Sequence, residues 1–382
     1  METLAGNLKP IETYRALFPV VTSKVWLNHA SQGTLSTPVR AALARFEEEH
    51  AMGDFSGESE EELYARVRRT VAEFINANPG EIAFTKNVPD GLNIVAHGLS
   101  WEAGDRIVIP DQEFPANVYP WLNLASKGVE TIMVPSREGA VPLEALIDAI
   151  DDRTRIVSVS WVEFSTGYRN DLRSLADACH EKGALFCVDA IQGLGALQFD
   201  VRELDIDIMA TSSHKWLLGP TGAGWMYCRE DLVDELSVCF IGQSSVQRFN
   251  FGSYLDFHLP LWHDARKFEP GIHNMLGLIG LEAALGLFSE VGMSRVESRV
   301  KALSDLVALG LSDRGYGIVG TREGNQWSGI VSFESGRFEA RDIYSALLAA
   351  GVFVSLREPV VRVSTHFYND EEDVSRLFAA LP

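Results

Sequence analysis

The stretch FCVDAIQGLGALQFDVRELDIDIMATSSHKWLLGPTGAGWMY, residues 186–227, decides the fold. It starts as an apolar run of strand type that stops at an acid, Asp189, and it ends in the polar cluster SSHKW and a glycine-rich turn. Lys215 of that cluster follows Asp189 by 26 positions, which is the length of one β-α-β excursion. Open parallel sheets bind ligands at the carboxyl ends of their strands. The spacing therefore predicts that Asp189 and Lys215 lie together at the carboxyl edge of one parallel sheet.

The residue types in this stretch indicate pyridoxal phosphate chemistry. An acid can hold a protonated ring nitrogen and a lysine can form a Schiff base, and these are the two protein groups that this cofactor requires. Gln192, three positions after Asp189, is predicted to reach a ring substituent of the cofactor. Ser212 and His214 flank Lys215 and are predicted to donate hydrogen bonds to a phosphate. A lone buried lysine is more often structural, so the interpretation depends on these elements occurring together.

The elements VDAIQ, SSHKW and GPTGAG resemble the fold-type I pyridoxal phosphate enzymes of the class V aminotransferase superfamily, in family order and at family spacing. This superfamily includes cysteine desulfurases, kynureninases and isopenicillin-N-epimerase-like proteins. The resemblance implies an α/β fold with a large, doubly wound, mostly parallel sheet and a smaller C-terminal α+β domain. We expect the large cofactor-binding domain to cover residues 20–260. Residues 1–19 and 275–382 are expected to form the small domain.

Composition narrows the class of protein. The chain has 382 residues, of which 46% are hydrophobic and 23% charged, as is typical of a soluble globular protein with two domains. Its net charge of −20 argues against a nucleic-acid partner or an anionic membrane surface. No apolar run is long enough to span a membrane, and no signal peptide is evident, so the cytoplasm is the expected location. The four cysteines lack metal-ligand spacing, so no metal is expected.

The turn after the expected strand 82–84 resembles the phosphate-binding turn of the family. A helix begins there, and helix N-termini bind anions through free N–H groups and the helix dipole. Val88 and Pro89 stand where the family usually has hydroxyl residues, and Pro89 has no N–H group. The phosphate is therefore expected to bind the N–H groups of Asn87 and Val88.

The stretch FEPGIHN, residues 268–274, resembles a segment that in relatives crosses a dimer interface to the phosphate of the neighbouring subunit. Ile272 replaces the usual threonine, so Asn274 is the side chain expected to serve there. The resemblance implies a homodimer.

Three further elements resemble the surroundings of cofactor and substrate. Phe114 falls where the superfamily stacks an aromatic ring on the pyridine face, although a phenylalanine is more commonly a core residue. Arg362 matches the arginine that forks onto the α-carboxylate of an amino-acid substrate, and the alternative is a strand arginine paired with a surface acid. The element LNHA implies substrate contacts by Asn28, His29 or Ala30, and the alternative is a plain strand and turn.

The expected catalytic residues are Asp189, His214 and Lys215. The acid keeps the ring nitrogen protonated, and the lysine amine, once released by the substrate, is placed to take the Cα proton as a general base. These steps are common to transamination, elimination and epimerisation of an amino acid, so the sequence leaves the outcome open. An epimerase would need a second acid or base, for which the candidates are His29, Tyr119, His273 and His366.

Cysteine desulfurase activity is disfavoured, because it needs a nucleophilic cysteine on a loop before the carboxylate-binding arginine. The last cysteine is Cys239, and the segment 355–361 is short and contains none. Kynureninase-like enzymes carry a tyrosine immediately before the lysine, where this chain has His214.

A second hypothesis is a protein of this fold that has lost catalysis and serves as a binding or assembly subunit. It is motivated by the altered residues Val88, Pro89 and Ile272. The joint presence of the predicted catalytic residues and the carboxylate-binding arginine favours the enzyme.

Overall fold

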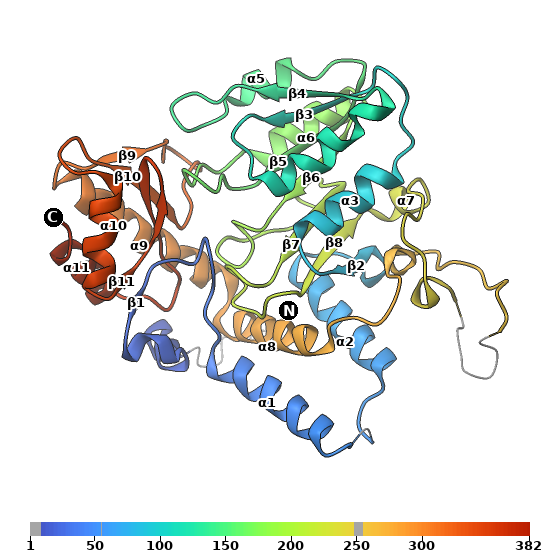
Figure 1. The fold of residues 1–382 in the computed structure, drawn as a ribbon, viewed down its shortest axis with the longest axis horizontal. Helices are drawn as coiled ribbons and strands as arrows, with labels where there is room; N and C mark the ends of the chain where they lie inside the picture. The colour runs from blue at the N-terminus through green and yellow to red at the C-terminus, as the bar shows by residue number, and fades with distance from the viewer. Residues whose placement is uncertain (1–8, 55, 248–254) are drawn as a thin grey trace, which may run out of the picture.

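The chain forms a large and a small α/β part (Figure 1) in a computed structural model that describes residues 9–54, 56–247 and 255–382. The stretches 1–8 and 248–254 of the expected domains lie outside the described residues. The large part is built on a seven-stranded sheet of order β2-β8-β7-β6-β5-β3-β4, in which β8 alone runs against its neighbours. Its strands are β2 Ile82–Thr85, β3 Arg106–Pro110, β4 Glu130–Val134, β5 Thr154–Ser160, β6 Leu185–Asp189, β7 Ile208–Ser212 and β8 Gly224–Cys228.

Helices cover both faces of this sheet, which explains the continuous apolar runs in its central strands. In β6, Phe186 and Val188 point into one hydrophobic core and Cys187 into the other. The helices of the large part are α1 Thr37–Ala51, α2 Glu60–Phe74, α3 Val88–Gly98, α4 Tyr119–Leu122, α5 Leu143–Asp148, α6 Leu172–Glu181, α7 Glu230–Val233 and α8 Met275–Val291. Short 3₁₀ helices occupy Ile11–Leu17, Pro19–Thr22, Pro79–Glu81, Pro115–Asn117, Asn123–Lys127, Gln243–Ser245 and Ala265–Phe268. The predicted α/β fold is confirmed.

The small part is an antiparallel sheet of order β12-β13-β10-β9, joined by a parallel pair of β1 with β11. Its strands are β1 Val25–Trp26, β9 Gly317–Val319, β10 Ile330–Glu334, β11 Val352–Phe353, β12 Ser355–Arg357 and β13 Val360–Ser364. Its helices are α9 Met293–Ser312, α10 Ala340–Ala349 and α11 Glu371–Ala379.

The packing of three segments bears on the expected domain boundaries. Phe18 stacks on Tyr368 with ring centroids 3.8 Å apart, so the N-terminal 3₁₀ helices lie against the C-terminal segment, and the assignment of residues 1–19 to the small domain stays a prediction. Helix α8, expected in the small domain, is buried in the hydrophobic core of the large sheet and contacts α1 and α2, because it is apolar on nearly all sides. Strand β1, assigned to the large domain, pairs with β11 of the small part.

Among the described residues, no single helix is long and apolar enough to cross a membrane. Helices α8 and α9 reach the length and hydropathy of a membrane span only when they are counted as one helix, and their axes are bent by 83° relative to each other.

A buried ion pair fixes the segment 268–274 to the large part. Arg68 of α2 forks onto Glu269 with N–O distances of 2.6 and 2.9 Å, and both side chains are nearly inaccessible. Glu269 also accepts the N–H group of Phe84 at 2.7 Å and lies 2.9 Å from Nε2 of His273. Burial alone would raise the pKa of Glu269, but Arg68 and His273 outweigh burial and lower this pKa to about 2.

Replacing Arg68 should strongly destabilise the fold. Arg68→Met leaves Glu269 buried without its cation, so the free energy of unfolding at pH 7 is expected to fall by about 3–5 kcal/mol. Because the folded pKa of Glu269 lies below the unfolded value of about 4.3, the stability from this pair is complete above that pH. This stabilisation is lost as the pH falls toward 2, so the difference in the free energy of unfolding between parent and variant should become smaller at low pH. Urea unfolding curves between pH 7 and pH 3 measure both effects.

The matched control is Arg69→Met, at the exposed neighbouring position of the same helix. It is expected to change the free energy of unfolding by less than about 0.5 kcal/mol. Equal losses in the two variants would contradict the role of the buried pair.

Candidate active site

The carboxyl ends of the central parallel strands bring the predicted site residues together. Asp189 is the last residue of β6 and pairs in register with Ala210 of the adjacent β7. Ser212 ends β7, and Lys215 follows in the turn that leads to β8. Gly33 packs directly on this turn, where an added Cβ would lie 2.1 Å from the carbonyl oxygen of Lys215. The loop after β1 therefore lies at the carboxyl edge of the sheet. Asp189 and Lys215 lie at this same edge, where the sequence predicted them.

Asp189 is a buried carboxylate with one unused oxygen. Its Oδ1 accepts the N–H group of Ile191 at 2.9 Å, whereas its Oδ2 is inaccessible and has no hydrogen-bond partner among the described residues. Burial raises the pKa of Asp189 to about 6, against the opposing effects of Ile191 and Lys215. A buried acceptor of this kind needs a donor, and a protonated ring nitrogen would supply one.

The amine of Lys215 is poised to lose its proton near neutral pH. The side chain is only 9% exposed. Burial lowers the pKa of Lys215 to about 8, and Arg362 and Arg357 contribute to the lowering while Asp189 opposes it. A lysine in this environment can act as a nucleophile or as a base, which an ordinary surface lysine cannot do at pH 7.

Phe114 lies beside this amine and is not a core residue. Its ring is 43% exposed, and its centroid is 5.5 Å from Nζ of Lys215. The ring of Phe164 meets it edge to face, with the centroids 5.2 Å apart. Phe114 therefore offers an accessible aromatic ring next to Lys215, and its stacking on a pyridine ring stays a prediction.

Ser212 and His214 interact with each other, since Oγ and Nδ1 lie 2.9 Å apart. Burial, with Lys215 as a smaller cause, lowers the pKa of His214 to about 4, so its imidazole is neutral at pH 7. Gln192 is more constrained than predicted. Its amide donates to the carbonyl of Ala30 at 3.0 Å and accepts from Nε1 of Trp216 at 2.9 Å. Contact of Gln192 with a ring substituent stays a prediction.

Arg362 of β13 is a buried cation without an acidic partner in the described part of the chain. Nη1 donates to the carbonyl of Phe164 at 2.5 Å, and Nη2 donates to Oγ of Ser31 at 2.8 Å and of Ser355 at 3.3 Å. The Nε atom is buried and has no partner. Burial, and then the nearby Arg357, lower the pKa of Arg362 to about 9. The alternative of a strand arginine paired with a surface acid is therefore wrong.

The three predicted residues of the LNHA element lie in different environments. Oδ1 of Asn28 accepts from Ser355 at 2.5 Å and so supports the hydroxyl groups around Arg362. The N–H group of Ala30 donates to Oγ of Ser364 at 3.0 Å. His29 is completely buried, and its ring nitrogens bond to the Ser364 carbonyl and the Tyr368 hydroxyl.

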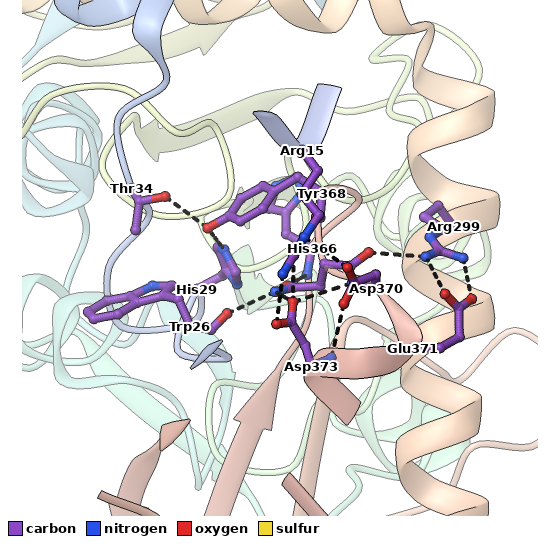
Figure 2. A network of polar contacts seen from close by, with 11 residues as sticks. Arg15, Trp26, His29, Thr34, Arg299, His366, Tyr368, Asp370, Glu371 and Asp373 are labelled. Carbon is purple, nitrogen blue, oxygen red and sulfur yellow. Dashed lines mark hydrogen bonds and ion pairs between the residues drawn. The ribbon is translucent and has the colours of Figure 1, made fainter. Parts of the chain in front are cut away.

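Figure 2 shows His29 inside a polar network that ties the loop after β1 to the C-terminal segment. The hydroxyl of Tyr368 lies 2.7 Å from Nε2 of His29 and 2.8 Å from the hydroxyl of Thr34. Burial lowers the pKa of His29 to about 4. His29 therefore holds the loop in place, and the structure does not bring it to the Lys215 amine.

Of the other proposed second acids or bases, two histidines are engaged in hydrogen bonds and the tyrosine is exposed. His366 is buried and bonds through Nε2 to the carbonyl of Trp216 at 2.8 Å. His273 is engaged with Glu269, while Tyr119 is 68% exposed at the start of α4.

The expected phosphate turn is the N-terminus of α3. Asn87 is the N-cap, and its side chain accepts the N–H group of Asp90 at 3.0 Å. Val88 is the first helical residue and is buried. Asn274 caps α8 and donates to the carbonyl of Gly222 at 3.1 Å. Phosphate contacts by Asn87, Val88 and Asn274 stay predictions.

Two further acids near Asp189 are buried, Glu113 and Glu163. Glu113, directly before Phe114, accepts from the backbone and the hydroxyl of Ser160. Burial raises the pKa of Glu113 to about 7 and that of Glu163 well above its ordinary range. Burial therefore favours the neutral form of both acids beside Asp189, and the sequence alone does not indicate that these two acids are buried.

Comparisons with known proteins agree with this geometry. The family model described as Aminotransferase class-V matches residues 43–377. A "Probable cysteine desulfurase" from Methanothermobacter thermautotrophicus is 32% identical over 390 residues, with 96% of each chain covered. The apo structure of a cysteine desulfurase from Thermococcus onnurineus NA1 has a TM-score of 0.88 at 26% identity, covering 98% of this chain and 97% of that one.

A second similar structure is that of the cystine C-S lyase C-DES with its reaction product cysteine persulfide. It has a TM-score of 0.87 at 25% identity, covering 95% of this chain and 98% of that one. The family match spans most of the chain and confirms the resemblance predicted from the sequence. The chain belongs to the class V aminotransferase family.

Proposed function

We propose that this protein is a pyridoxal phosphate enzyme that acts on an α-amino acid and carries the cofactor on Lys215. The observation that supports this most directly is a lysine of lowered pKa lying within the electrostatic reach of a buried acid and a buried arginine. Perturbed groups that converge in this way are typical of functional sites. A subunit that had lost catalysis would have no need to keep all three groups buried.

The residues present fit the cofactor. The unused Oδ2 of Asp189 suits the N–H group of a protonated pyridine nitrogen, and the exposed ring of Phe114 suits the flat face of the pyridine. The N-terminus of α3, an eleven-residue helix, offers backbone N–H groups for the phosphate.

When bound, pyridoxal phosphate supplies an electron sink that weakens the bonds to the substrate Cα. Arg362 would bind the substrate α-carboxylate, and its position would set which Cα bond faces Lys215. The amine of Lys215, with a pKa of about 8, would accept the Cα proton as a general base. Asp189 would accept from the ring nitrogen, and the exposed ring of Phe114 would cover one face of the pyridine.

We infer that the reaction outcome is of the lyase type and proceeds without a persulfide on the enzyme. The similar proteins named cysteine desulfurase and cystine C-S lyase favour chemistry at a carbon–sulfur bond. The segment before Arg362 is the tight hairpin of β12 and β13, and it carries no cysteine. Three of the four thiols are buried, at Cys179, Cys187 and Cys228. Transamination and epimerisation remain as alternatives, because they share the removal of the Cα proton with the lyase reaction.

We also infer that the active unit is a homodimer. Several large apolar side chains are exposed among residues 240–247 and 255–272, close in sequence to the segment 268–274, which resembles one that crosses a dimer interface in relatives. They are Phe240, Ile241, Leu255, Phe257 and Ile272. Large apolar side chains left exposed to water are often covered in protein–protein contacts.

Lys215→Ala should abolish covalent attachment of the cofactor. The parent is expected to absorb visible light as a yellow protein, and borohydride reduction should attach pyridoxal phosphate to the peptide that contains Lys215. The exposed Lys182→Ala, at the end of α6, is the control and should label like the parent. Attachment to any other lysine would show that the assignment is wrong.

Incubation with L-cysteine should leave no persulfide on the protein. Mass spectrometry after alkylation is expected to find all four cysteines as thiols, because three are buried and no cysteine precedes Arg362. Cys239→Ser removes the one exposed thiol and should leave turnover unchanged. A persulfide on Cys239 in the parent, lost together with turnover in this variant, would instead support a desulfurase.

Light scattering should report a dimer for the parent. The double substitution Phe240→Ser and Ile241→Ser is expected to shift the protein toward the monomer, because it removes two exposed apolar anchors. Leu309→Ser, at an equally exposed position of α9, should remain dimeric. A parent that is monomeric with full cofactor occupancy would contradict the dimer.

A further inference from the structure

Arg357 forms, with Arg362, a pair of like charges that the described part of the chain leaves unneutralised. Arg357 ends β12, and its register partner on β13 is Val360, two residues before Arg362. Its Nη2 donates to Oγ of Ser31 at 3.3 Å, and Nη2 of Arg362 donates to the same oxygen at 2.8 Å. One hydroxyl therefore joins the two guanidinium groups.

The hydrogen bonds around Ser31 place neutral oxygens against these two charges. Ser355 donates to Oδ1 of Asn28 at 2.5 Å, so the hydroxyl of Ser31 must donate to Ser355, 2.7 Å away. The oxygen of Ser31 is then left to accept from both arginines. Each contact is with a neutral oxygen, and neither arginine has a carboxylate within ion-pair distance in the described residues.

The neighbouring acid is already engaged elsewhere. Glu358 follows Arg357 in the chain, but it lies 2.7 Å from Nη2 of Arg341 on α10. Arg357 reaches the active site electrostatically, since it lowers the pKa of both Lys215 and Arg362. In a chain of net charge −20, two adjacent cations without an acid indicate a site built for anions.

The two arginines differ in depth. Arg362 is 1% exposed, whereas Arg357 is on the surface, so one charge is buried and the other meets solvent on the far side of the shared Ser31 hydroxyl. A substrate α-carboxylate carries one negative charge and balances only the inner arginine. The outer arginine retains donors that are not used by Ser31 or by the Leu356 carbonyl.

We propose that Arg357 binds a second anionic group on the substrate side chain, so that the enzyme prefers an amino acid with two acidic groups. This inference rests on the proposed function and names its substrate class. Because Arg357 is exposed, solvent screens its charge, and we expect it to favour the diacid by about tenfold.

Calorimetry on the holoenzyme tests this without turnover. The probes are succinate and glutarate, each compared with the monoamide of the same length, succinamate and glutaramate. The parent should bind at least one diacid about tenfold more tightly than its monoamide. Arg357→Gln should weaken that diacid until the two affinities match, while leaving the monoamide unchanged. Arg357→Lys should restore part of the preference, because it keeps the charge without the planar fork.

Arg376→Gln, an exposed arginine of α11, alters the net charge equally and should keep the parent preference. The proposal is overturned if the parent binds neither diacid, binds diacid and monoamide equally, or keeps its preference in Arg357→Gln. Equal weakening of both ligands also overturns it, because Arg357 would then hold the first carboxylate. None of the four probes has an amine that could form a Schiff base, so these results are separate from the labelling of Lys215.

Discussion

The active site depends on two buried charges that the described residues do not neutralise. Asp189 and Arg362 are each about 1% exposed, and each keeps one inaccessible polar atom without a partner. Removing a charge from water is unfavourable unless the charge is paired, so both groups are suited to pairing with a ligand. The same burial lowers the pKa of Lys215, on which Asp189 and Arg362 also act. One constraint, exclusion of water from the strand ends, therefore sets both the binding and the acid–base properties of the site.

The two charges come from different parts of the molecule, and a short loop connects them. Asp189 belongs to the parallel sheet, whereas Arg362 belongs to the small antiparallel sheet. The loop after β1 contacts both parts of the molecule. The carbonyl of Ala30 accepts from Gln192, which follows β6, and the hydroxyl of Ser31 accepts from Arg362 of β13. The hydrogen bonds of the buried His29 to Ser364 and Tyr368 fix the conformation of this loop (Figure 2). The hydrogen bonds of His29 can thus affect how Arg362 is oriented relative to Lys215, through the loop that carries Ser31.

The sequence predicted the parts of this arrangement that depend on local order along the chain. Asp189 and Lys215 could be located because both follow apolar strands of one parallel sheet, whose ends meet by topology. Their neighbours could not be located in the same way. The burial of Glu113 and the internal position of His29 arise from packing between distant segments, and Arg357 looks like any surface arginine until Ser31 is placed beside it. The packing of α8 against the large sheet could not be predicted for a related reason, since an apolar helix gives no indication of which core it joins.

The pairing of the loop after β1 with the last fifty residues has a consequence for how the chain reaches its native state. His29 bonds to Ser364, 335 positions away, and Ser31 bonds to Arg362 at a separation of 331. Contacts of such long sequence separation form late, because the intervening chain must first be ordered. During synthesis the large sheet can assemble from the N-terminal side, yet Arg362 and the hydroxyl groups around it are not in place until β13 has been released. A chain released only as far as β8 therefore contains Lys215 but lacks the arginine that we propose binds the substrate.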